Sequence, residues 1–360
     1  MSMDSDEGRR GATLDRRSFL AGCGALLTAA GLSSCEESAA PAGPDATSSK
    51  DGPTADTAPR HEASVGASGV VVDVHDERAL DGDLKYDTAR VTAMLAAGLL
   101  ELAKATDLKH AWKTLLPSAD ASTRIGIKTN QRGLCVSSPT LIKALVDTLR
   151  ADLDVAPERA IVWDCAQSEL KASGVTAAVV GATVLGTGAS PSVVGPSNPG
   201  YDAPVPLMST QVSFSKIFTQ MTDLTINLAT LKDHSISGAT GALKNIFGGV
   251  EKPGELHDGL SVKLPALNAL GIVRDRMRLY IIEAIQAVAF DGPNGPVTHT
   301  PRRLLLSTDP LAVDVHAIAL LNQLRGAKNP IPTAMLGWVD EASRLGLGSK
   351  TPQVRTLEMG

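Results

Sequence analysis

The sequence has few aromatic residues, few cysteines and no concentration of positive charge. Phe, Trp and Tyr make up 3% of its 360 residues, and the formal net charge is −5. Surfaces that bind nucleic acid need basic patches, so the composition argues against a nucleic-acid partner. No Cys-x-x-Cys pair is present, and such pairs are typical of structural zinc sites.

Cysteine is also too scarce for an iron–sulfur cluster. Cys23 and Cys35 lie in the N-terminal segment, which leaves Cys135 and Cys165 for the folded part. Two thiolates cannot hold such a cluster alone, because it takes four ligands. In an oxidising compartment these two residues could form a disulfide; the alternative is two buried thiols.

The N-terminus has the pattern of an export signal. Residues 15–20 read D-R-R-S-F-L, a twin-arginine pattern, and an apolar run follows over 21–32. This run is too short to span a bilayer, as in a signal peptide. It ends in L-S-S-C, which resembles a bacterial lipobox, although an ordinary signal with a chance cysteine gives the same letters. We predict a twin-arginine signal peptide over 1–35, lipid on Cys35, and anchoring at the cell envelope.

A change of composition marks the start of the folded part. Residues 36–68 are rich in Ala, Pro, Ser, Thr, Asp and Gly and have almost no large apolar side chain. Such a segment cannot bury enough surface to order itself, so we predict a disordered linker. Residues 69–360 are then expected to form one domain, at the upper end of the usual size range.

Short apolar runs alternate with helical patterns along this domain. We expect helices over 87–105, 139–149, 311–325 and 333–345, and strands over 70–74, 124–128, 160–163, 224–226, 280–282 and 304–306. Strands separated by helices predict an α/β fold with a mostly parallel twisted sheet and helices on both faces, that is, a Rossmann-like, doubly wound fold. The Gly- and Pro-rich region 174–212 gives no clear assignment.

Polar residues follow the predicted strands. They are Lys128, Asn130, Asp164, Asn227, Asp291 and Asp309. Open parallel sheets bind ligands outside the carboxyl ends of their strands, so we expect these side chains to converge at one edge. Each alone could instead form a turn or cap a helix, and Asp309 before Pro310 fits a cap better than a ligand.

The segment 227–257 carries the strongest signal for a ligand site. His234 and His257 bracket Lys244 in a run dense in Gly, Ser and Thr, with Gly241 close by. Glycine lets the backbone approach a ligand, and small hydroxyl residues leave backbone N–H groups available to an anion. We predict that His234, Lys244 and Asn245 lie together with Lys128 and Asp164.

Each of these residues has more than one interpretation. Lys244 could clamp a phosphate or carboxylate, or be a solvated surface lysine; Leu243 before it excludes a Walker A loop. His234 could be an acid/base group or a structural imidazole. His257 could ligate a metal, with Asp258 orienting its second nitrogen, or lie exposed on a loop.

Five segments together resemble a known family. They read I-G-I-K-T-N (125–130), I-V-W-D (161–164), D-L-T-I-N-L-A-T-L-K-D-H (223–234), G-A-L-K-N-I-F-G-G (241–249) and S-T-D-P-L-A-V-D (307–314). The family is named domain of unknown function 362. Many of its members carry ferredoxin-like cluster motifs. This chain has none, so we expect no iron–sulfur cluster.

The order His, Gly-rich spacer, Lys, His is also similar to the lactate racemase family that uses a nickel-pincer nucleotide. This resemblance implies a metal-nucleotide cofactor held by Lys244, a metal ligand at His257 and an acid/base group at His234. The step of ten residues from His234 to Lys244 fits that family. The next step, to His257, is shorter, and no second acid/base histidine is evident upstream.

We therefore expect an exported, lipid-anchored protein with a cofactor- or anion-binding site at the carboxyl ends of the strands. Its activity would be proton or hydride transfer on a small carboxylate, as in a racemase, an isomerase or an oxidoreductase. The alternative is a non-catalytic envelope lipoprotein that binds a small anion through Lys244, Lys128 and the Gly-rich backbone around Gly241. The expected partners are a small-molecule ligand, the membrane and the twin-arginine export machinery.

Overall fold

The computed structural model describes residues 69–188 and 198–360. The predicted signal peptide, the predicted lipidation site at Cys35 and the predicted linker over 36–68 lie outside this part. Within it, no helix is both long enough and apolar enough to cross a membrane.

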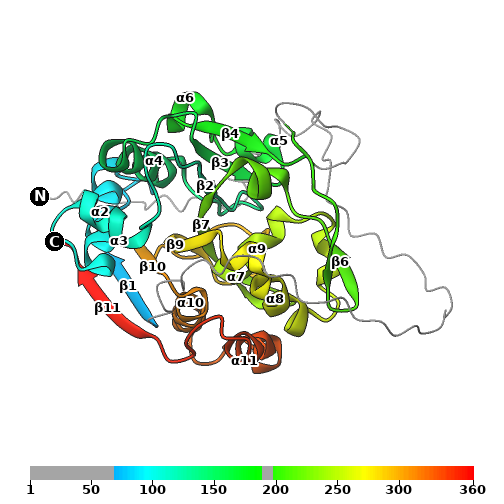
Figure 1. Ribbon diagram of the computed structural model, residues 1–360. Helices are drawn as coiled ribbons and strands as arrows, with labels where there is room; N and C mark the ends of the chain where they lie inside the picture. Colours follow the sequence, from blue (N-terminus) through cyan, green and yellow to red (C-terminus); the bar gives the residue numbers. More distant parts are fainter. Residues whose placement is uncertain (1–68, 189–197) are drawn as a thin grey trace, which may run out of the picture. The chain divides into compact units, whose positions relative to one another are not determined.

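A nine-stranded sheet forms the centre of the domain (Figure 1), with the strand order β11-β1-β10-β9-β7-β2-β3-β4 and β8 paired to β7. All its strands point the same way except β10 and the short β8. The strands are β1 (Val70–His75), β2 (Ile125–Lys128), β3 (Ala160–Asp164), β4 (Thr183–Gly186), β7 (Leu224–His234), β8 (Gly238–Thr240), β9 (Met277–Val288), β10 (Arg303–Ser307) and β11 (Gln353–Glu358). Two further strands, β5 (Val205–Leu207) and β6 (Thr210–Val212), pair only with each other.

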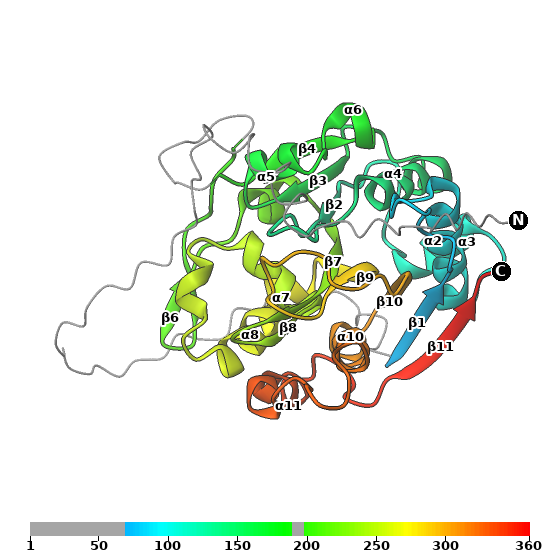
Figure 2. The same ribbon diagram turned by 180° about the vertical axis from the view of Figure 1, so that it is seen from behind.

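Helices cover both faces of the sheet (Figures 1 and 2). One apolar cluster joins the sheet to α2 (Thr88–Ala103), α3 (Leu108–Leu115), α4 (Pro139–Leu153), α5 (Gln167–Ala172) and α6 (Ala177–Val180). The other joins it to α7 (Ala242–Asn245), α8 (Leu260–Ala269), α9 (Gly271–Arg274), α10 (Pro310–Arg325) and α11 (Gly337–Arg344). Single turns of helix lie at η1 (Ile217–Met221), η2 (Ile246–Gly249), η3 (Pro253–Leu256) and η4 (Thr333–Leu336). The predicted mostly parallel α/β fold is confirmed.

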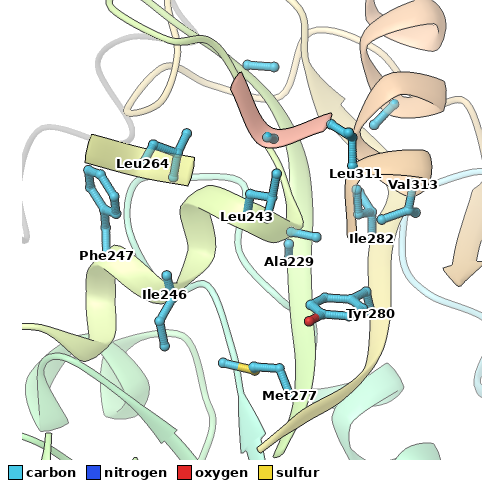
Figure 3. Close-up of a cluster of buried hydrophobic side chains, with 14 of the residues drawn as sticks. Ala229, Leu243, Ile246, Phe247, Leu264, Met277, Tyr280, Ile282, Leu311 and Val313 are labelled. Carbon is cyan, nitrogen blue, oxygen red and sulfur yellow. The ribbon is translucent and has the colours of Figure 1, made fainter. Parts of the chain in front are cut away.

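Strands buried on both faces explain the near-continuous apolar runs in the sequence. In β7, Leu228 belongs to the cluster under α4, while its neighbour Ala229 belongs to the cluster under α7. Figure 3 shows the second cluster, in which Leu243 and Ile246 of the α7–η2 segment lie against β7 and β9.

The predicted helix starts are confirmed. The carboxylate of Asp87 accepts a hydrogen bond from Arg90 N, and Ser138 caps α4 in the same way. Asp309 accepts from Ala312 N at 2.8 Å, so it is the helix cap that the sequence favoured. The last predicted helix is divided into η4 and α11.

β7 and β9 are several residues longer than predicted, and β10 runs antiparallel to its neighbours. β7 has 11 residues, so Asn227 lies inside the strand and not at its end. The second half of β7 contains polar residues that are nevertheless buried, because loops supply hydrogen-bond partners for their side chains. The run of apolar residues in the sequence therefore ends before the strand does. β10 is antiparallel to β9, so Asp309 leaves the sheet at the opposite edge from Lys128. The prediction that all six polar residues converge at one edge is wrong for Asp309. Asn227, although it lies inside β7, pairs with Lys128 and therefore lies beside it.

Candidate functional site

The order of the strands reverses between β2 and β7. From β2 the chain adds β3 and β4 on one side, whereas β7 and β9 follow on the other side. In such sheets a crevice opens at the carboxyl ends of the two strands where the order reverses, and ligands bind there. Lys128 ends β2, and His234 ends β7. The topology therefore places the predicted residues at the usual ligand position.

A buried ion pair lies at this edge. Lys128 Nζ is 2.7 Å from Asp164 Oδ1, and both side chains are almost completely buried. Asp164 also accepts hydrogen bonds from the backbone N–H groups of Gln131 and Cys165, each at 2.7 Å. A Cβ atom on Gly248 would lie 2.8 Å from both Lys128 Nζ and Asp164 Oδ1, so only glycine fits there.

Asn245 of α7 connects the ion pair to both central strands. Its amide nitrogen donates to Lys128 O at 3.2 Å and to Asn227 Oδ1 at 2.8 Å. Its Oδ1 accepts from Asn130 at 3.3 Å, and Lys128 Nζ lies 3.5 Å away. The strand residue Asn227 thus belongs to this network, although it is not at a strand end.

A second buried lysine lies in β7 next to this network. Lys232 Nζ donates to Asn130 Oδ1 and Arg132 O, both at 2.7 Å, and to Cys135 O at 3.0 Å. All three acceptors are neutral oxygens, so they solvate the ammonium group but supply no negative charge to balance it. Burial lowers the pKa of Lys232 to about 8.

Lys244 is the third lysine of the site. Its Nζ lies 3.1 Å from His257 Nε2 and 4.5 Å from the centre of the Phe247 ring. Burial, followed by the charge of Lys232, lowers the pKa of Lys244 to about 7. The side chain is only half-buried, unlike those of Lys128 and Lys232.

The two histidines are stacked on each other. Their ring centres are 5.5 Å apart and their planes differ by 9°. His234 Nδ1 accepts from Ile236 N at 3.1 Å, so the neutral ring carries its proton on Nε2. His257 Nδ1 lies 3.3 Å from Gly254 O and must donate to it, which leaves Nε2 to accept from Lys244. Burial and the charges of Lys244, His257 and Lys232 lower the pKa of His234 to about 3.

Positive charge is therefore in excess at this edge. Among the described residues, the lysines that form salt bridges are Lys85, Lys128, Lys143 and Lys350. Lys232 and Lys244 thus have no carboxylate partner in the part of the chain that the structure describes. Burying a cation without a counter-charge is costly, so such a site favours an anionic ligand.

Gly241 has a structural reason to be glycine. A Cβ atom there would lie 2.1 Å from Asp314 Oδ1. The Asp314 carboxylate accepts from Ala242 N at 2.5 Å and from Leu243 N at 3.0 Å, and it thereby holds the start of α7, on which Lys244 and Asn245 lie. Burial raises the pKa of Asp314 to about 7.

The predicted residues are brought together in two adjoining groups: Lys128, Asp164 and Asn245, and His234, Lys244 and His257. Lys232 was missed, because a lysine inside a strand gives no signal by itself. Its position two residues before His234 puts it on the same face of β7, and that spacing could have identified it. Asp291 follows β9. The backbone N–H of its neighbour Gly292 donates to Asp233 Oδ1 at 2.6 Å, and this contact does not involve Lys244.

In the part of the chain that the structure describes, side chains alone build no metal centre. Within residues 69–188 and 198–360, no three His, Cys, Asp or Glu side chains gather as a metal site. A metal at His257 would therefore take most of its ligands from a bound small molecule. Cys135 and Cys165 are not joined by a disulfide. Cys135 is buried, as the second alternative predicted, whereas Cys165 is only partly buried.

The comparisons with known proteins bear on the family and the fold. A family model described as domain of unknown function (DUF362) matches residues 124–319, which is more than half of the chain. No curated protein matches. One similar solved structure is a protein from Thermotoga maritima, a target of the Northeast Structural Genomics Consortium, with 13% identity and a TM-score of 0.36. The match covers 60% of this chain and 58% of that chain, so less than two thirds of that protein's length is matched.

Proposed function

The chain belongs to the domain of unknown function family DUF362, whose name assigns no activity, and we propose that its strand-end site binds a small anion. Lys244 would contact the anion and exchange a proton with it. His234, which its low pKa holds neutral, would donate a hydrogen bond to the anion from Nε2. The ligand we favour is a small carboxylate.

The uncompensated charge of Lys232 and Lys244 is the observation that carries this proposal. Lys232 uses all three N–H donors on protein oxygens, so it contributes a fixed positive field. Lys244 has one described hydrogen-bond partner and a partly exposed side chain, so it retains donors for a ligand. An anion that accepts from Lys244 would offset the cost of burying both charges.

Proton transfer fits Lys244 better than the histidines. His234 is held neutral by its low pKa, and in this state its Nε2–H can donate a hydrogen bond to a ligand oxygen. A group whose pKa lies near neutral pH is suited to exchange protons at that pH, and Lys244 meets this condition.

The alternative is a binding protein without catalysis. The fixed charge of Lys232 favours it, because it makes the site cationic without any moving proton. A metal-nucleotide cofactor at Lys244, with His257 as a metal ligand, would be a further way to use the same charge. Such a cofactor would supply its own ligands and electrophilic chemistry, and intact mass and metal content of protein from its native host would reveal it.

Replacing Lys244 by Met should abolish binding of small carboxylates without unfolding the protein. No described carboxylate loses a partner in this variant, so the free energy of unfolding should stay the same or rise slightly. Calorimetric titration with lactate and with inorganic phosphate measures the binding, and thermal melts measure the stability.

Lys263 offers the matched control, since its ammonium donates only to Glu255 O near the same site. The Lys263→Met variant should bind as the wild type does. Equal affinity in the wild type and in Lys244→Met would contradict the proposal, whatever the melts show.

We also propose that the chain is exported by the twin-arginine route and anchored through lipid on Cys35. The support is the pattern of residues 15–35 in the sequence. In the native host, Cys35→Ala should release the protein from the membrane fraction, and its mass should lack acyl chains. Removing residues 36–68 should leave the melting temperature of the domain unchanged, because this segment has little apolar surface to bury. A membrane-bound Cys35→Ala protein would rule out the anchor.

A further inference from the structure

The surroundings of Lys244 leave its amine available for chemistry as well as for binding. Nζ lies between the His257 ring and the face of Phe247, and no described carboxylate holds it as an ammonium. The side chain reaches the partly exposed side of α7 and is not sealed in the core. A desolvated lysine beside another cation is the arrangement that makes a lysine nucleophilic.

His257 is oriented to take the proton that an attacking amine must lose. Its Nδ1 donates to Gly254 O, so the lone pair of Nε2 faces Lys244 Nζ at 3.1 Å. This is the distance at which a general base accepts a proton directly.

We propose that Lys244 forms an imine with a small anionic carbonyl compound, with 2-oxo acids as the chemical class. This rests on the proposed anion site, because the charge of Lys232, which has no described carboxylate partner, is what selects an anionic carbonyl over a neutral one. The amine nitrogen bonds to the carbonyl carbon, and the C=O π bond opens. One proton from nitrogen passes to His257 Nε2 and on to the oxygen, which gives a carbinolamine. A second proton, taken from solvent, lets this hydroxyl leave as water while the nitrogen lone pair forms C=N, so the product is the iminium ion.

The iminium product keeps one positive charge at Nζ, beside the carboxylate of the bound acid. The charge complementarity of the site is therefore preserved, and the iminium can withdraw electrons from the neighbouring C–H bond. That bond is the one on which a proton-transfer site would act.

The test is reductive trapping on the full chain. The protein is incubated with pyruvate and sodium cyanoborohydride between pH 5.5 and 9, and the modified peptide is identified by mass spectrometry. We expect one adduct, on Lys244. Lys244→Arg keeps the cation and removes the nucleophile, so it should not be trapped. Lys263→Met should be trapped like the wild type.

The outcomes separate this inference from the proposed function. Lactate binding without a Lys244 adduct from pyruvate would overturn the imine and leave the anion site standing. A Lys244 adduct that forms equally well with acetone, in a protein that binds neither lactate nor phosphate, would support the reactive lysine and remove the anion site. Adducts spread over surface lysines, with none at Lys244, would overturn the inference.

Discussion

Replacing Asp164 by Asn is expected to lower the free energy of unfolding by about 3–5 kcal/mol, the usual cost of removing one partner from a buried ion pair. The side chain keeps its size, but Lys128 loses its counter-charge in a place that water does not reach. The new amide group also faces N–H donors where the carboxylate accepted them from Gln131 and Cys165. Chemical denaturation of wild type and variant measures the difference.

The chain contains a matched surface pair for comparison. Lys143 Nζ lies 2.8 Å from Asp147 Oδ2, nearly the same distance as in the buried pair, but both side chains are 48% exposed. Asp147→Asn should cost about 0.3–0.5 kcal/mol, because water screens the interaction. If the two variants lose equal stability, burial is not what makes the Lys128–Asp164 pair important.

Replacing Gly241 by Ala should cost about 2–4 kcal/mol, because the new methyl group meets a carboxylate that cannot move away. Asp314 is buried in α10 and is held by two N–H groups at the start of α7. If Asp314 shifts, α7 loses its N-terminal partner, and Lys244 and Asn245 move with it. Ligand binding should therefore fall together with stability.

Two variants test this explanation. Gly82 has nothing within 4 Å of an added Cβ atom, so Gly82→Ala should change stability by less than about 0.5 kcal/mol. Adding Asp314→Ala to Gly241→Ala removes the atoms that clash, so the two changes together should cost less than the sum of the single changes. Strict additivity would show that the two positions do not interact.

The sequence predicted most of the fold because its local signals agree with the tertiary structure. Caps such as Asp87 and Ser138 marked the helices, and apolar runs marked the strands buried on both faces. The direction of β10 could not be predicted, because its apolar run reads the same in either orientation. The length of β7 was underestimated, because Thr230 and Lys232 are buried by contacts that come from distant loops.

The sequence predicted which residues belong to the site better than it predicted how they are arranged. His234, Lys244 and His257 lie within one segment, so their proximity was readable from spacing and glycine content. The link between Asn245 and Asn227 was not, because it depends on how α7 lies across β7. Gly241 shows the same limit. The sequence suggested that this glycine lets the backbone approach a ligand, whereas in the structure a Cβ atom added there would collide with Asp314, which lies far along the chain.

The pairing of β1 with β11 has a consequence for how this domain is made. Val70 pairs with Gln353, so the two strands are separated by almost the whole folded chain. A ribosome must synthesise all the intervening residues before this side of the sheet can close, and such distant pairing is slow to form. Until then β1 has an unpaired edge that another copy could join. Closure of the sheet is therefore a late event, and nascent chains need protection from one another up to that moment.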